Sequence, residues 1–278
     1  MATLVVHSGG IGDFILSCPA IAALSADAPI ELLGIQSRLD LAVEWGFART
    51  AYDFDAVDFG TAFTNPSPRL REFLSAFDRA VVWMRDDGAI SRTFRACGID
   101  RVDTYPGLPP EAWPGHASEY YLSCLGLDAS PTPPPWPLAS TDPFAYSYDI
   151  VIHPGSGSPK KNWPLEHFLE LAEALTASER NTAWILGPAE RDSDMCRSLG
   201  DIDVVQVSSL VELAHRLAKA KLYIGNDSGI THLAAALGCP TIAIFGPTDP
   251  AKWGPIGAQV TSVQDLPWPS VAGGLARC

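Results

Sequence analysis

The 278-residue sequence has no long hydrophobic run, and no window approaches the roughly 20 consecutive apolar residues of a membrane-spanning helix. The first residues, MATLVVHSGG, carry no basic flank and lead directly into a strand-like segment, so we expect no signal peptide. The six cysteines are scattered without a CxxC pair or a metal-ligand spacing, which favours reduced thiols. We therefore expect a cytoplasmic protein that contacts the inner face of the cytoplasmic membrane, if at all, only peripherally.

Positive charge is scarce, and the first half contains no lysine. The net charge is −13, and residues 1–148 carry 18 acidic residues against nine arginines. Such a chain does not offer the basic face that nucleic acid or anionic lipid would require. All five lysines lie in the second half, at positions 160, 161, 219, 221 and 252. Their position indicates either an anionic ligand in that half or a bias of surface composition, and composition alone leaves both open.

Several catalytic and cofactor motifs are also missing. There is no GxGxxG dinucleotide fingerprint, no GxSxG nucleophile elbow and no HExxH helix. Three DxD strings occur, at 53–55, 192–194 and 201–203, but none lies in a glycine-rich loop, and a chain with 21 aspartates produces such strings by chance. We therefore expect neither a metal nor a cofactor.

Short apolar runs alternate with amphipathic segments in both halves. The strands expected from this pattern are 2–8, 29–35, 80–84, 148–154, 182–188, 204–208, 222–227 and 241–247; the helices are 14–25, 90–98, 116–127, 164–178, 210–221 and 229–238. Unbroken apolar strands separated by helices are typical of parallel sheets that are covered on both faces. The fold class is therefore predicted to be α/β.

A proline-rich stretch divides the chain. Residues 128–147 contain six prolines and cannot hold a helix, so we interpret them as a linker between domains at 1–127 and 148–278. A disordered internal loop is the alternative. Both halves open with a strand, a histidine and a Gly/Ser-rich loop, LVVHSGGIGD and IVIHPGSGSPK. The likeness is consistent with two similar folds but is too short to establish a repeat.

Two of the glycine-rich loops are candidates for binding an anion. In SGGIGD, Gly10 and Gly12 let backbone N–H groups approach a ligand at a helix start, and Asp13 is either catalytic or simply a cap. The loop HPGSGSPKKNWP combines hydroxyl, amide and ammonium donors that suit a diphosphate, although an exposed basic turn would look the same. Its candidate ligands are Ser156, Gly157, Ser158, Lys160 and Lys161.

The segment GNDSGITHLAAALG gives the strongest local signal. Its candidate donor-binding residues are Asp227, Ser228, Gly229, Thr231 and His232, which converge on a predicted helix start where the dipole favours an anion. A helix cap and a packed histidine would explain the same residues. The next predicted strand is followed by FGPTDPAKWGP, a rigid loop with Lys252 at the sheet edge where ligands of α/β proteins bind.

These motifs resemble the heptosyltransferases of glycosyltransferase family 9. The resemblance lies in residues 9–24, 153–168, 187–191 and 225–255, and it covers most of the second half but only the start of the first. It implies a GT-B architecture, in which two Rossmann-like domains face each other across a cleft. It further implies that the first domain binds the acceptor and the second binds the nucleotide sugar. By the same resemblance Asp13 is the general base, Lys161 contacts the diphosphate and Glu190 binds the ribose.

The implied reaction is an inverting, metal-independent transfer of a sugar, heptose from ADP-heptose, to a glycan hydroxyl such as one of lipopolysaccharide core. Asp13 would accept the hydroxyl proton while Lys161 stabilises the leaving diphosphate. Two departures stand out: the chain end lacks a clear final helix, and the acidic first domain favours a less anionic acceptor. A non-catalytic sugar-nucleotide-binding protein and a sugar-nucleotide epimerase are the competing hypotheses.

Overall fold

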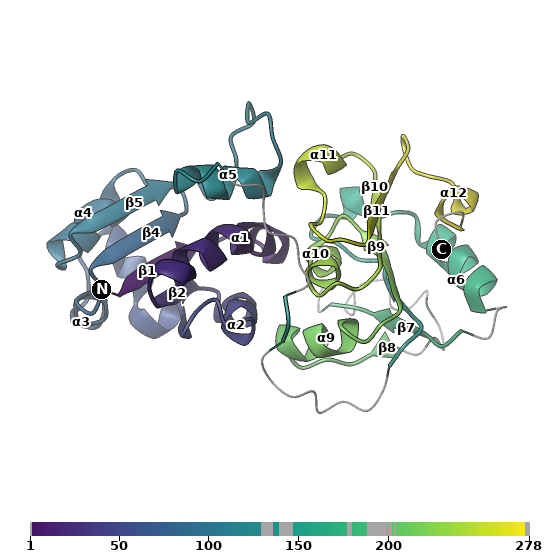
Figure 1. Ribbon diagram of the computed structural model, residues 1–278, viewed down its shortest axis with the longest axis horizontal. Helices are drawn as coiled ribbons and strands as arrows, with labels where there is room; N and C mark the ends of the chain where they lie inside the picture. Colours follow the sequence, from purple (N-terminus) through teal and green to yellow (C-terminus); the bar gives the residue numbers. More distant parts are fainter. Residues whose placement is uncertain are drawn as a thin grey trace. The chain divides into compact units, whose positions relative to one another are not determined.

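The computed structural model describes residues 2–128, 136–138, 147–176, 180–187, 199, 202 and 204–275. These residues divide into two compact units: unit 1 includes 2–128, and unit 2 includes the described part of 147–275. Each unit is built on one parallel sheet with helices packed against it (Figure 1). The α/β class expected from the sequence is thereby confirmed. None of the described helices combines the length and the apolar character needed to cross a membrane.

Unit 1 has a five-stranded sheet in the order β3-β2-β1-β4-β5. Its strands are β1 (Thr3–His7), β2 (Ile30–Gly34), β3 (Thr50–Asp53), β4 (Arg79–Trp83) and β5 (Arg101–Tyr105). Its helices are α1 (Ile11–Asp27), α2 (Gln36–Glu44), α3 (Pro68–Leu74), α4 (Ala89–Ala96) and α5 (Ala117–Cys124), with short 3-10 turns η1 (Asp55–Val57) and η2 (Phe59–Phe63).

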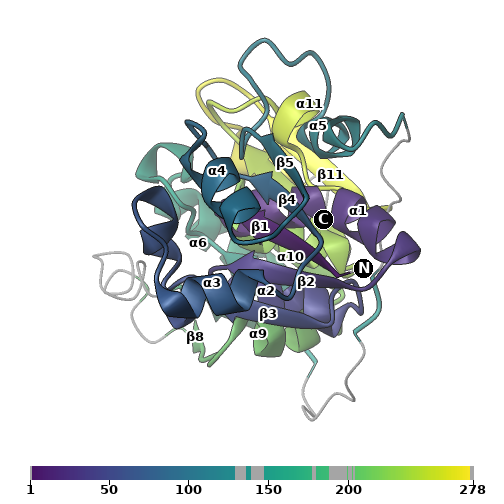
Figure 2. The same cartoon turned by 90° about the vertical axis from the view of Figure 1, so that its left-hand side faces the viewer.

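Both faces of this sheet are covered, as the unbroken apolar strands predict. Leu4 and Val6 of β1 pack with Phe59, Leu70 and Phe94, which come from η2, α3 and α4. Helices α1 and α5 pack against each other, and Figure 2 shows them on the side of the sheet opposite α4. The central strand β1 is therefore buried along its whole length, and only its carboxyl end opens into a loop.

Unit 2 has a six-stranded parallel sheet in the order β11-β10-β9-β6-β7-β8. Its strands are β6 (Ile150–His153), β7 (Thr182–Ile185), β8 (Val204–Val205), β9 (Leu222–Asn226), β10 (Thr241–Phe245) and β11 (Val260–Gln264). Its helices are α6 (Leu165–Thr176), α9 (Leu210–Leu217), α10 (Gly229–Ala236), α11 (Pro250–Trp253) and α12 (Val271–Leu275), with the 3-10 turn η3 (Pro159–Lys161).

The two units share one topology. When the strands of each unit are numbered from its first strand, the orders read 3-2-1-4-5 and 3-2-1-4-5-6. In both sheets the order reverses beside the first strand, between β1 and β4 and between β6 and β9. The carboxyl ends of strands at such a switch point form the usual ligand crevice of open α/β sheets. The similar openings of the two halves thus belong to equivalent strands.

The structure also contains elements that the sequence pattern does not predict. Strands β3, β5 and β11 were missed because they lie at or near sheet edges and carry polar residues, as in TAYD and VTSVQ. The chain end was expected to lack a clear helix, and this is wrong in part: α12 packs against α6, with Val271 in the core. Within the proposed linker, Trp136 is buried and its backbone N–H donates to the carbonyl of Ala236.

Candidate functional site

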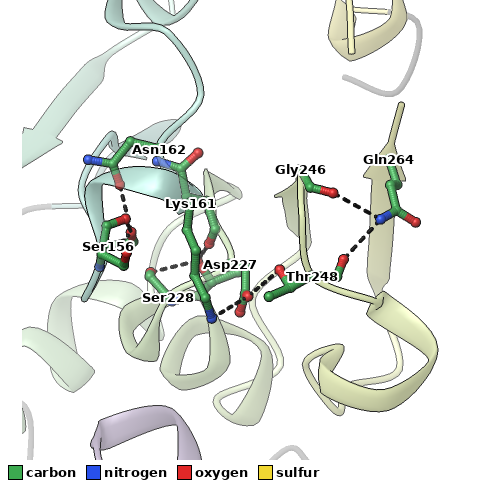
Figure 3. Close-up of polar contacts among 11 residues, drawn as sticks. Ser156, Lys161, Asn162, Asp227, Ser228, Gly246, Thr248 and Gln264 are labelled. Carbon is green, nitrogen blue, oxygen red and sulfur yellow. Dashed lines mark hydrogen bonds and ion pairs between the residues drawn. The ribbon is translucent and has the colours of Figure 1, made fainter. Parts of the chain in front are cut away.

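Three loops of unit 2 meet at the carboxyl ends of β6, β9 and β10, which are neighbours in the sheet. We call residues 154–163 after β6 the lysine loop and residues 246–249 after β10 the threonine loop. Between them, the end of β9 leads through Asp227 directly into α10. Figure 3 shows polar side chains from all three segments pointing toward one another. The site therefore lies at the switch point where ligands of this fold class bind.

An ion pair bridges this switch point. The Lys161 Nζ atom lies 2.7 Å from Asp227 Oδ2, so the ammonium that follows β6 meets the carboxylate that follows β9. The same carboxylate oxygen accepts a hydrogen bond from Thr248 Oγ1, also at 2.7 Å. Asp227 is only 6% exposed, whereas Lys161 is 34% exposed. The lysine can therefore exchange its partner with a ligand while the aspartate stays in place.

A buried amide fixes the lysine loop to the strand beside it. Asn226, at the end of β9, has no exposed surface. Its Nδ2 donates to the Pro154 carbonyl at 2.7 Å, and its Oδ1 accepts from the Trp163 N–H at 2.9 Å. Both ends of the loop are thus held by one side chain. The Trp163 indole, itself buried, donates to the Pro269 carbonyl and anchors the loop in the core.

Helix α10 begins with a network of hydroxyl groups. Ser228 is the N-cap, and its Oγ accepts from the Thr231 N–H. The fully buried Thr231 hydroxyl donates to the Asn226 carbonyl and lies 3.2 Å from the Tyr223 hydroxyl. Gly229 is the first residue of the helix. These contacts place the positive end of the helix dipole at the site, where it favours a bound anion.

The histidines of the site are buried. Burial lowers the pKa of His153 from 6.5 to about 4, so its ring is neutral near pH 7. Its Nδ1 lies 3.4 Å from the Ser228 hydroxyl, which joins the end of β6 to the start of α10. His232 is also buried, in the first turn of α10.

The remaining candidates of the lysine loop mostly shape its backbone. The Ser156 hydroxyl contacts the Ser158 carbonyl and the Asn162 side chain, and it accepts from the Ser158 N–H. Gly157 and Lys160 are exposed at the tip. The loop thus combines a rigid internal turn with one exposed lysine and one lysine paired to Asp227.

The equivalent loop of unit 1, residues 8–13, which we call the glycine loop, presents a carboxylate. Gly10 caps α1, Gly12 lies in the first turn, and Asp13 Oδ2 accepts from the Gly10 N–H at 3.0 Å. The cap that the sequence allows for Asp13 therefore exists, and it does not exclude a catalytic role. The guanidinium of Arg38 donates to the Gly9 carbonyl, which holds the loop from the α2 side.

His7 lies directly beneath the glycine loop. Its Nδ1 accepts from the Gly9 N–H at 3.2 Å, and its ring packs edge-on against Phe14. Burial, helped by the charge of Arg38, lowers its pKa from 6.5 to about 3. The histidine is therefore neutral and structural, and Asp13 is the acidic group that the loop offers at its rim.

The predicted residues thus fall into three groups. Within unit 2 the fold brings together Lys161, Asp227 and Ser228, with the hydroxyl of Thr231 turned inward. Gly10, Gly12 and Asp13 form the glycine loop of unit 1. Glu190 and the aspartates of two DxD strings lie outside the described residues; in the third string the Asp53 carboxylate accepts the backbone N–H groups of Gln36 and Asp55. Across the described part of the chain, no three His, Cys, Asp or Glu side chains group as metal ligands would.

Sequence reasoning missed four residues that shape these loops: Arg38, Asn226, Thr248 and Gln264. Asn226 and Thr248 stand within motifs that the sequence singled out, so their positions were noticed but not their contacts. Gln264 lies on the unpredicted strand β11, and Arg38 lies on α2. A pattern along the chain does not show which loops become neighbours, because the strand order decides that.

Comparison with known proteins finds relatives of this chain in sequence and in fold. The family model described as glycosyltransferase family 9 (heptosyltransferase) matches residues 138–270. Lipopolysaccharide heptosyltransferase 1 of Pseudomonas aeruginosa is 28% identical over an alignment that covers 96% of this chain and 85% of that protein.

Two solved structures from Escherichia coli have the same fold. ADP-heptose lps heptosyltransferase II matches with a TM-score of 0.78 and 18% identity, covering 100% of this chain and 97% of that one. A heptosyltransferase solved with ADP matches with a TM-score of 0.73 and 21% identity, covering 99% and 98%. The two parallel-sheet units are thus those of the GT-B class. By sequence the chain resembles the heptosyltransferases of glycosyltransferase family 9, and these relatives indicate that it is a glycosyltransferase.

Proposed function

We propose that the chain transfers heptose from ADP-heptose to a hydroxyl of a glycan acceptor such as lipopolysaccharide core, with inversion at the anomeric carbon. The observation that carries the proposal is the Lys161–Asp227 pair beside the N-terminus of α10, because it gathers donors for a diphosphate at the switch point of unit 2. The names of the similar proteins, lipopolysaccharide and ADP-heptose heptosyltransferases, support the choice of donor and acceptor.

In this proposal unit 2 holds the nucleotide sugar. Lys161 leaves Asp227 to contact the diphosphate, and the first amides of α10 face the same charge. Glu190 binds the ribose hydroxyls, and Asp227, Ser228, Gly229 and His232 surround the diphosphate and the sugar. As the bond between the anomeric carbon and the diphosphate oxygen breaks, negative charge accumulates on ADP. Lys161 stabilises that charge, so the step proceeds without a metal ion.

Unit 1 supplies the base and the acceptor surface. The Asp13 carboxylate accepts the proton of the acceptor hydroxyl as that oxygen attacks the anomeric carbon from the face opposite ADP. The new glycosidic bond forms as the old one breaks, which inverts the configuration. The shortage of positive charge in this half favours a weakly anionic acceptor. We place the reaction in the cytoplasm, with peripheral contact at the membrane that carries the acceptor.

The test is a turnover assay with ADP-heptose and a lipopolysaccharide core acceptor. We expect release of ADP and a glycosylated product whose anomeric configuration, measured by nuclear magnetic resonance, is opposite to that of the donor. A product with retained configuration would overturn inversion, and dependence on an added divalent ion would overturn metal independence. Binding of ADP-heptose without any turnover would instead favour the non-catalytic alternative.

A further inference from the structure

One carboxylate oxygen at the site has two donors that come from different strands. Asp227 Oδ2 accepts from Lys161 Nζ, which follows β6, and from Thr248 Oγ1, which follows β10, each at 2.7 Å. An ammonium and a hydroxyl therefore converge on a single point at the carboxyl edge of the sheet (Figure 3). Of these two donors, only Lys161 is predicted from the sequence to bind a ligand.

The threonine loop is held rigidly, so its hydroxyl has a fixed position. Gln264 Nε2, on β11, donates to the carbonyls of both Gly246 and Thr248, at 3.1 and 2.9 Å. The Trp268 ring packs so closely on Gly246 that a Cβ atom there would lie 2.5 Å from it. Asp249 then caps α11 through the Ala251 N–H. The loop is thus fixed at both of its ends and from the neighbouring strand.

We propose that the Thr248 hydroxyl is a further binding group for the diphosphate of the donor, and that Gln264 positions it. The inference rests on the proposed function, since it names an additional ligand in the same site. In the free protein Asp227 Oδ2 accepts the hydrogen bond from Thr248 that a phosphate oxygen accepts when the nucleotide binds. The Thr248 O–H then turns about its Cβ–Oγ1 bond from the carboxylate to the phosphate.

The chemistry of the two acceptors makes this exchange favourable. A phosphate oxygen and a carboxylate oxygen accept hydrogen bonds at similar short distances, and both strengthen bonds from hydroxyl and ammonium donors. A bound diphosphate brings more charge than one carboxylate, so it competes well for Lys161 and Thr248. A threonine hydroxyl on a rigid loop loses little conformational entropy when it binds.

The test measures ADP affinity by calorimetry in three variants. Thr248→Val removes the hydroxyl at nearly constant shape, and we expect about tenfold weaker binding, the loss typical of one hydrogen bond to a charged group. Thr248→Ser keeps the hydroxyl and should bind within about twofold of wild type. Thr261→Val is the matched control, because Thr261 is half-buried on β11 and its substitution leaves the loop untouched. Wild-type affinity in Thr248→Val would overturn the inference.

A second pair of variants distinguishes direct contact between Thr248 and ADP from an effect that Thr248 exerts through Asp227. In an Asp227→Asn background, which removes one negative charge next to the diphosphate and so keeps ADP binding measurable, Thr248→Val should still weaken binding about tenfold. If the loss disappears there, Thr248 acts only by holding Asp227, and the inference is wrong. If wild type itself binds no ADP, the proposed function fails as well. Normal ADP binding by Thr248→Val would leave that function standing.

Discussion

Equivalent loops follow equivalent strands in the two units, but their charged side chains have opposite sign. Both β1 and β6 end at a buried histidine, and the chain then enters a Gly/Ser-rich segment. In unit 1 the segment presents the carboxylate of Asp13, held by the Gly10 N–H. In unit 2 it presents the ammonium of Lys161, held by a carboxylate from the next strand.

The point where the next helix starts accounts for the difference. In unit 1, α1 begins at Ile11, soon after the end of β1, and Asp13 lies in its first turn. In unit 2 the loop continues through η3, and α6 begins only at Leu165. The longer loop carries Lys161 across to β9, where α10 supplies the helix start. One topology thus presents a carboxylate in one unit and an ammonium beside a helix start in the other.

We expect the largest effect when the carboxylate that unit 1 presents is removed. Asp13→Asn retains a carbonyl oxygen for the Gly10 N–H but cannot accept a proton, so we expect kcat to fall at least about 1,000-fold. ADP affinity should stay nearly unchanged. Steady-state kinetics with ADP-heptose and calorimetry with ADP measure the two quantities.

Asp53→Asn provides the matched control for that variant. Asp53 ends the edge strand β3, and its carboxylate accepts the backbone N–H groups of Gln36, at the start of α2, and of Asp55. We expect its kcat to remain within about twofold of wild type. Normal turnover in Asp13→Asn would remove Asp13 as the base and leave the capping role alone.

The next largest effect is expected for Asn226, whose side-chain amide holds both ends of the lysine loop of unit 2. Asn226→Ala leaves the Pro154 carbonyl and the Trp163 N–H buried without their partner. The free energy of unfolding should fall by about 2–4 kcal/mol, and ADP affinity should fall with it because Lys161 is no longer fixed. Urea denaturation measures the first quantity. The exposed Asn181→Ala should change it by less than about 0.5 kcal/mol, and an equal loss there would contradict the assignment.

The smallest effect concerns the two buried histidines that end β1 and β6. His7 and His153 have pKa values of about 3 and about 4 in the folded protein, below the ordinary 6.5. The unfolded chain therefore binds protons that the folded chain does not, so stability falls as pH drops below 6.5. Each histidine should contribute a loss of about 1.5 kcal/mol between about pH 6.5 and about pH 5.

Urea denaturation at several pH values checks this expectation. In His153→Gln one of the two protonation steps is absent, so stability should depend less steeply on pH than in wild type. A pH dependence as steep as that of wild type would show that burial does not hold this histidine neutral.

The sequence predicts the apolar parts of this fold well and the polar parts poorly. Strands such as β1 and β10 are fully buried and read as unbroken apolar runs, whereas β3 and β11 carry polar side chains that periodicity does not recognise. The same limit holds for the site. Lys161 and Asp227 stand out in their motifs, but the roles of Asn226 and Gln264 depend on which loops become neighbours, and only the strand order sets that.

The most direct test of the account compares two lysine–aspartate pairs that join the same two strands. Lys161–Asp227 lies at the carboxyl ends of β6 and β9, and Lys221–Asp149 lies at their amino ends. Calorimetric titration with ADP should show about 10- to 100-fold weaker binding for Lys161→Ala and wild-type binding for Lys221→Ala. Unchanged affinity in Lys161→Ala, or an equal loss in both variants, would contradict a diphosphate site at the carboxyl edge of the unit 2 sheet.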